Sequence, residues 1–237
     1  MKKNVKLISA IGVAVVIVAL ILTGILKTAG TIDVVGKGSV DSFEAVLSAS
    51  DSGVVFDEEN KGWKLEAPDG SAGFIWSGNF SESPLFDVML SVDAAPFVEA
   101  GLDIEKLPEY YTVQDGMLLV GTQLGEDQGK EEATPKAAYE EIVRKYPHQI
   151  GYHTPMDHYN ISLGNGNLFE WAKNMEMNGS VKEAQDKDIV FVLHPEPLIA
   201  AGVDPEKVEG WAYTTVSMGM GASAEEMYKF LKPFDLQ

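Results

Sequence analysis

The chain has 237 residues and no cysteine, which excludes disulfide bonds, thiolate ligands and a lipid thioether. It carries 36 acidic residues against 18 lysines and arginines, a formal net charge of −18. Nucleic acid and anionic lipid surfaces repel a protein of this charge, so we expect no nucleic-acid partner.

Residues 7–26 form an uncharged, apolar stretch. A helix of that length, with about 1.5 Å of rise per residue, spans a hydrocarbon core about 30 Å thick. Three lysines precede the stretch and only one follows closely, which favours a cytoplasmic N-terminus. We therefore predict that residues 1–30 are a signal anchor and that the chain is a single-pass protein of the cell membrane with its C-terminal part outside. The alternative is a signal peptide cleaved after the small residues 28–30, which would release a secreted protein.

The part beyond residue 30 is more acidic still. The first thirty residues hold four lysines and no acid, so 14 basic residues remain against 36 acidic ones, a formal charge of −22. Cations, basic proteins and neutral glycans remain open as partners. The same charge also serves to keep an exposed domain soluble.

An internal duplication organises this part of the chain. Residues 96–106 align without a gap with residues 197–207, and six of the eleven positions are identical, where chance would give roughly one. The similarity continues upstream in three further pairs of segments: 87–92 with 188–193, 74–76 with 169–171, and 43–46 with 139–142. We predict two tandem copies of one unit, residues 31–125 and 126–237.

Each copy begins with a predicted helix. Apolar residues at helical spacing indicate one helix around residues 43–47 and another around 139–146. In the second copy Thr134 supplies an N-cap, Pro135 suits the first turn, and Pro147 ends the helix.

A hairpin follows in each copy. Residues 64–77 contain the turn sequence Pro68-Asp-Gly70, and residues 160–172 contain Gly164-Asn-Gly166. Short apolar runs on both sides of such turns are typical of paired antiparallel strands.

The repeated motif predicts two short helical turns. Gly101 and Gly202 each follow the first turn, where a left-handed conformation suits glycine. Asp103 and Asp204 then suit the N-cap of the second turn.

The last predicted elements are two strands and a helix. We expect equivalent strands at 116–122 and 211–218, and a closing C-terminal helix that runs from a capping box at Ser223 and Glu226 to Pro233. The fold class is therefore predicted as α+β: a transmembrane helix followed by two α/antiparallel-β units, packed as one pseudo-symmetric two-lobed body.

Three of the four histidines, with one aspartate, are the candidate metal ligands. His148, His153, Asp157 and His158 combine imidazole and carboxylate groups, which divalent zinc, copper or nickel prefer. The first copy has Ser52, Asp57 and Gly62 opposite the three histidines, so the fold does not require imidazoles there. The spacing matches no established zinc motif, and a polar loop cluster is the alternative interpretation.

Two Met-x-Met pairs are the candidate Cu(I) ligands. They are Met175 with Met177, and Met218 with Met220. The second pair aligns with Met117 and an apolar neighbour, which core packing explains equally well.

Aromatic residues are the remaining candidates for a binding surface. Tryptophans at equivalent places, Trp76 and Trp171, indicate core positions. Tyr152 and Tyr159 flank the histidine cluster and are the better candidates for the surface.

No catalytic motif is complete. The sequence contains no Gly-x-Ser-x-Gly, no Ser-x-x-Lys and no His-Glu-x-x-His. We therefore expect a non-catalytic binding or envelope-assembly module with a protein or small-ligand partner. The alternative is a metal-binding or metal-dependent protein that uses the histidine cluster.

Overall fold

The computed structural model describes residues 32–50, 53–77, 87–122, 134–153, 156–175, 187–218 and 225–236. The predicted signal anchor, residues 1–30, lies outside these ranges. Within them, no helix has the length and apolar character needed to cross a bilayer.

The two predicted helices are present. Helix α2 spans Val34–Ala49, and the Asp33 side chain caps it by accepting a hydrogen bond from the Gly36 N–H at 2.8 Å. Helix α4 spans Pro135–Lys145 and has Thr134 as its N-cap, as the sequence indicates.

The first copy forms a six-stranded antiparallel sheet in the order β1-β2-β3-β4-β6-β5. Its strands are β1 (Val54–Asp57), β2 (Gly62–Glu66), β3 (Ala72–Ser77), β4 (Val88–Asp93), β5 (Tyr111–Gln114) and β6 (Met117–Thr122). Helix α3 (Ala95–Glu99) and the 3-10 turn η1 (Ile104–Lys106) connect β4 to β5.

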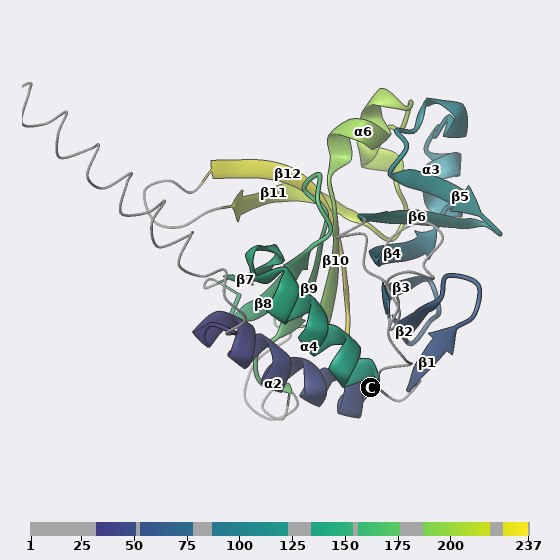
Figure 1. Ribbon diagram of the computed structural model, residues 1–237. Helices are drawn as coiled ribbons and strands as arrows, with labels where there is room; N and C mark the ends of the chain where they lie inside the picture. The colour runs from purple at the N-terminus through teal and green to yellow at the C-terminus, as the bar shows by residue number, and fades with distance from the viewer. Residues whose placement is uncertain are drawn as a thin grey trace, which may run out of the picture.

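The second copy repeats this topology as a second sheet in the order β7-β8-β9-β10-β12-β11 (Figure 1). Its strands are β7 (Ile150–His153), β8 (His158–Ser162), β9 (Leu168–Ala172), β10 (Ile189–Leu193), β11 (Ala212–Met218) and β12 (Glu225–Phe234). Helix α6 (Pro195–Ala200) and the turn η3 (Pro205–Lys207) connect β10 to β11, and η2 (Pro147–Gln149) precedes β7. The α+β class and both predicted hairpins are thus confirmed.

The predicted C-terminal helix is wrong, because residues 225–234 form strand β12. Met227, Phe230 and Leu231 have helical spacing, yet a short apolar run is ambiguous between helix and strand. β12 pairs with β10 on one side and β11 on the other, and so satisfies backbone groups of both neighbours.

The correction also changes which strands are equivalent. In the shared strand order, β11 occupies the place of β5 and β12 the place of β6. The predicted equivalence of 116–122 with 211–218 is therefore wrong, and the duplication extends to the last strand.

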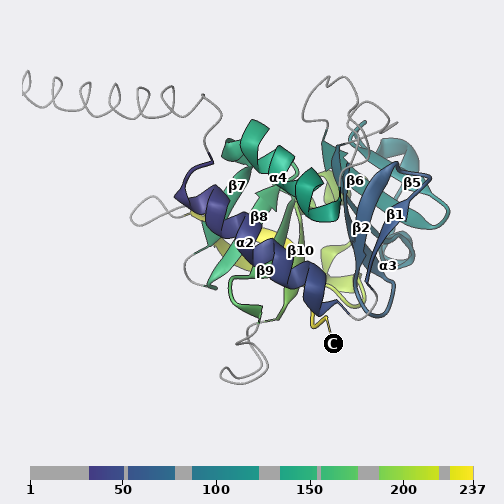
Figure 2. The ribbon, with the colours of Figure 1, turned by 60° about the horizontal axis from the view of Figure 1, so that its bottom comes forward.

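The two helices are exchanged between the copies. Helix α2 packs on β7, β8 and β9 of the second sheet, whereas α4 packs on β3 of the first, and the two helices lie side by side (Figure 2). Ser42 Oγ donates to the carbonyls of Ala172 at 3.2 Å and Lys173 at 2.9 Å, and Trp76 Nε1 donates to the Pro135 carbonyl at 2.9 Å. One continuous apolar core therefore includes residues from both copies.

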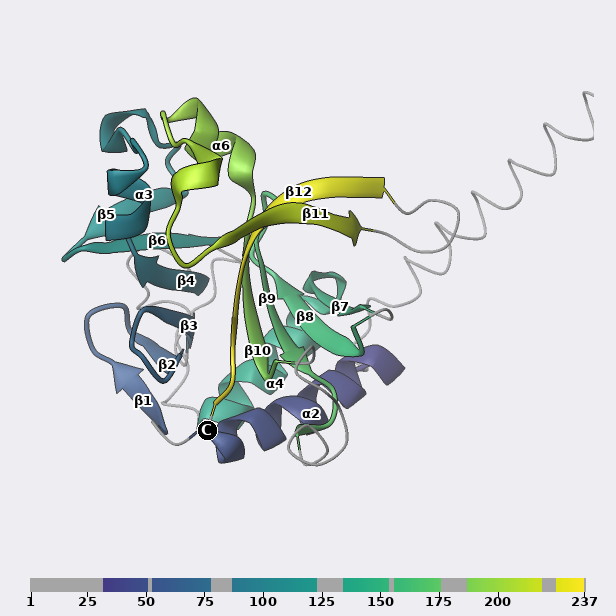
Figure 3. The same ribbon diagram turned by 180° about the vertical axis from the view of Figure 1, so that it is seen from behind.

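The repeated motifs meet at a seam where α3 and α6 lie next to each other (Figure 3). The Asp103 N–H donates to the Ala201 carbonyl, and the Asp204 N–H donates to the Ala100 carbonyl, both at 2.8 Å. The two hydrogen bonds are reciprocal, because each repeated motif donates one to the other.

Candidate functional site

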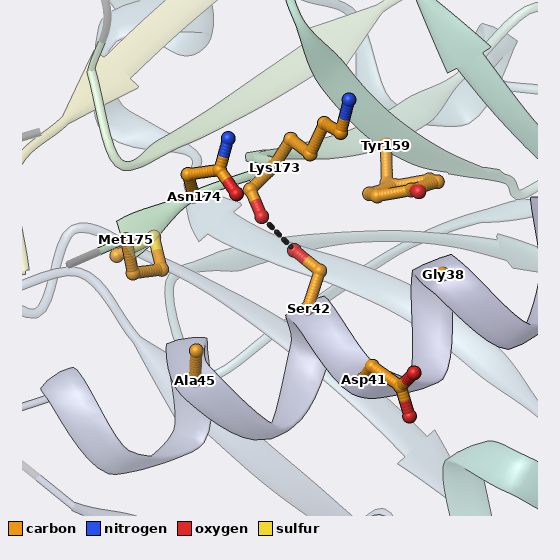
Figure 4. A pocket seen from close by; sticks show the side chains of 8 residues that line it. All are labelled: Gly38, Asp41, Ser42, Ala45, Tyr159, Lys173, Asn174 and Met175. Carbon is orange, nitrogen blue, oxygen red and sulfur yellow. Dashed lines mark hydrogen bonds between the residues drawn. The ribbon is translucent and has the colours of Figure 1, made fainter. Parts of the chain in front are cut away.

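A pocket of about 410 Å³ lies between α2 and the segment that follows β9 (Figure 4). Its wall consists of Gly38, Asp41, Ser42, Ala45, Tyr159, Lys173, Asn174 and Met175. The exchange of helices builds it, because α2 comes from the first copy and the opposite wall from the second.

Gly38 has no side chain, so the Tyr159 ring can lie directly against α2 at one side of the pocket. A Cβ at Gly38 would lie only 2.1 Å from the Tyr159 hydroxyl oxygen, so a larger residue would displace the ring. Tyr159 is buried, and its ring packs against those of Tyr152 and Trp171. The predicted surface position of Tyr159 is therefore wrong: its ring is buried and lines the pocket. Tyr152 packs against this ring.

Lys173 supplies a fixed positive charge at the pocket. The Ser42 hydrogen bond holds its backbone, and its Nζ lies 3.7 Å from Asp157 Oδ1 and 5.2 Å from the centre of the Tyr152 ring. The nearby Asp157 carboxylate raises the pKa of Lys173, which therefore remains charged at neutral pH. Tyr152 donates its hydroxyl to Asp157, and this bond raises the pKa of Tyr152.

Asp41 supplies the opposite charge from α2. Its exposed carboxylate pairs with Lys37 at 2.7 Å, one helical turn earlier. Ala45 and Met175 add apolar surface. The pocket thus combines an ammonium group, a carboxylate and an apolar wall, a combination suited to a small zwitterionic or neutral molecule.

The structure places two predicted metal ligands together. His153 on β7 and His158 on β8 are cross-strand partners. Tyr159 and Ile161 of β8 face the core, so His158 lies on the opposite, outer face of the sheet. Each Nδ1 lies near Glu170 Oε2 of β9, at 4.0 Å from His153 and 3.8 Å from His158.

The other two predicted ligands lie apart from this pair. Asp157 bonds Tyr152 and pairs with Lys173 beside the pocket, and His148 is exposed in η2. As the side chains are positioned in the described part of the chain, no three His, Asp or Glu groups lie close enough together to hold a metal ion. The metal site therefore stays a prediction, and Glu170 is a carboxylate within 4.0 Å of both His153 and His158.

Sequence reasoning overlooked Glu170, although a signal for it was present. The alignment of residues 74–76 with 169–171 places Glu170 opposite Ile75. The first copy has a buried isoleucine at this position and the second copy has a carboxylate. A charged residue is rarely buried without a partner, so the difference indicates a role other than core packing.

The Cu(I) site at the Met-x-Met pairs stays a prediction, because one methionine of each pair lies outside the described residues. Met175 lines the pocket, while Met177 and Met220 lie outside the described residues. The tryptophans at the two equivalent positions, Trp76 and Trp171, are fully buried, as predicted for a duplicated core.

Comparison with known proteins adds no relative. No protein-family model matches the chain, and no curated protein or solved structure matches it at a significant level.

Proposed function

We propose that this protein is a membrane-anchored, extracytoplasmic and non-catalytic module that binds a small zwitterionic ligand between α2 and the end of β9. The observation that carries the proposal is the pocket of about 410 Å³, with Lys173 and Asp41 in its wall. A free amino acid has the matching chemistry. Its carboxylate would meet Lys173, its ammonium Asp41, and its side chain the apolar wall.

Charge favours a zwitterion over a simple anion. A part of the chain with formal charge −22 repels anions over long range, and Asp157 already partly neutralises Lys173. A ligand with both charges avoids this repulsion and still pairs with each group.

Ligand binding is tested with the full chain purified in detergent. Free leucine, methionine and phenylalanine, each titrated while the melting temperature is recorded, should stabilise the protein in a saturable way. Ala45→Trp should abolish the shift because the indole fills the pocket. Ala137→Trp, at an exposed position of α4, is the matched control and should retain it. Equal shifts for both variants, or none for the wild type with any amino acid, would contradict the proposal.

The membrane anchor is tested separately on intact cells. The charge bias around residues 7–26 motivates an N-inside orientation. Protease added outside should remove the chain beyond about residue 30 and spare the N-terminus. Protection of the whole chain would overturn this orientation, and a mature N-terminus near Thr31 would show a cleaved signal instead.

A further inference from the structure

The outer face of the second sheet buries three side chains that the fold itself does not require. His158 is fully buried, Glu170 is 6% exposed, and His153 is mostly covered. On the same face Leu168, Val190 and Val192 form a separate apolar cluster, and Val190 is the cross-strand partner of Glu170.

The first copy shows that this arrangement is optional. By strand register, Asp57 and Gly62 pair as His153 and His158 do. The position of Glu170 is taken by Ile75, which is 1% exposed. An apolar residue therefore suits this place in the sheet.

The two imidazoles are left without hydrogen bonds that would compensate their burial. Among the described residues, neither ring nitrogen of His153 or of His158 has a hydrogen-bond partner. Burial of unpartnered polar groups and of a carboxylate is costly. A cation held between them would satisfy both imidazoles and the carboxylate at once.

We propose that His153, His158 and Glu170 are the protein ligands of a single divalent transition-metal ion. Two imidazole nitrogens and one carboxylate oxygen match the preference of zinc, and of cobalt or nickel in its place. This assignment is independent of the pocket beside α2, and it replaces His148 and Asp157 of the sequence prediction by Glu170.

The ligand atoms lie close to, but not at, binding distance. Bonds of about 2.0–2.1 Å to a tetrahedral ion place ligand atoms about 3.3 Å apart. The two Nδ1–Oε2 distances are 3.8 and 4.0 Å. Small side-chain rotations of His153 and Glu170 close this difference of about half an ångström or slightly more. Since the ring nitrogens of His153 have no hydrogen-bond partner among the described residues, rotation of this imidazole breaks no hydrogen bond there.

The test is a titration of the full chain, purified in detergent and stripped with a chelator, with Co²⁺ as the probe. We expect one equivalent to bind with the visible absorption of a low-symmetry cobalt site, and Zn²⁺ to displace it. Glu170→Gln and His158→Asn should each weaken binding by at least about 100-fold, because each removes a direct ligand. His148→Asn and Asp157→Asn are matched controls and should bind as the wild type does.

A second variant separates metal binding from folding. Glu170→Ile installs the residue that the first copy carries at this position, so the metal-free protein should melt cooperatively and at least as high as the wild type. It should also bind no cobalt. The proposal is overturned if the wild type binds no stoichiometric Co²⁺, if Glu170→Gln binds as tightly as the wild type, or if His148→Asn or Asp157→Asn loses binding.

Discussion

Gly101 and Gly202 face each other across the seam between the two copies. A Cβ on Gly101 would lie 2.8 Å from the Gly202 carbonyl oxygen, and a Cβ on Gly202 would lie 2.7 Å from the Gly101 carbonyl oxygen. Both glycines have positive φ, +107° and +104°, as predicted from their place after a helical turn.

Alanine at either glycine should therefore destabilise the protein. Positive φ alone costs on the order of 1–3 kcal/mol for a residue other than glycine, and the contact with the opposite carbonyl adds to it. Gly70→Ala is the control, since Gly70 also has positive φ but a Cβ there would meet no atom within 4 Å beyond its chain neighbours. In urea denaturation, Gly101→Ala and Gly202→Ala should each have a lower free energy of unfolding than Gly70→Ala. Equal losses of stability in all three variants would exclude a contribution from the contact with the opposite carbonyl.

The two N-cap aspartates should make the seam sensitive to acid. Hydrogen bonds from Lys106 to Asp103 and from Lys207 to Asp204 are the main cause of the lowered pKa of each carboxyl group. The folded-state pKa of each carboxyl group lies below its ordinary value of 3.8. The stability that the ionised carboxylate contributes is therefore complete above pH 3.8, and it is lost as the pH falls through the lower, folded-state pKa.

The double variant Asp103→Asn/Asp204→Asn should therefore lose stability near neutral pH and show a shallower fall below about pH 4. Thermal melts across this range measure both effects. An acid dependence identical to that of the wild type would show that other carboxylates dominate it.

The exchanged helices predict that neither half folds alone. Without residues 126–237, helix α2 loses the sheet on which it packs, and without residues 31–125 the first-copy helix no longer covers β7 to β9. Each half expressed separately should give no cooperative melt, whereas the two mixed should recover one. A half that melts cooperatively as a monomer would contradict this expectation.

Lys229 should reduce stability at neutral pH. It is 1% exposed, its Nζ donates to the Gly166 carbonyl at 2.8 Å, and burial lowers its pKa below 10.5. The folded state therefore binds fewer protons than the unfolded state between the lowered pKa and 10.5, so stability rises with pH across that range.

Lys229→Met should raise the stability at neutral pH by on the order of 1 kcal/mol and remove this alkaline rise. The first copy has a methionine, Met117, at the position equivalent to Lys229. The equivalence follows from strand pairing: Leu118 pairs with Val92 as Phe230 pairs with Leu193, so the residues that precede them, Met117 and Lys229, also correspond. Lys232→Met, on the same strand, should leave the rise intact. Urea denaturation between about pH 7 and pH 10 distinguishes the two variants, and a destabilised Lys229→Met would contradict the argument.

The sequence by itself determined the features that depend on local chemistry. The duplication is visible as similar segments in the two halves of the sequence. The two hairpins, the N-caps at Thr134, Asp103 and Asp204, and the positive φ of the motif glycines follow from residues within a few positions of one another. Capping side chains, prolines and glycines act on their own backbone, so their effect is readable without the fold.

Only the tertiary structure decided which elements share a core. The spacing of Met227, Phe230 and Leu231 allowed a helix, but the open place between β10 and β11 required a strand. Likewise, the sequence placed Asp157 beside His158, whereas strand pairing turns Asp157 towards Tyr152 and brings Glu170 to the histidines. Backbone pairing and burial join residues far apart in the chain, and their energies outweigh the weak local preferences that a sequence displays.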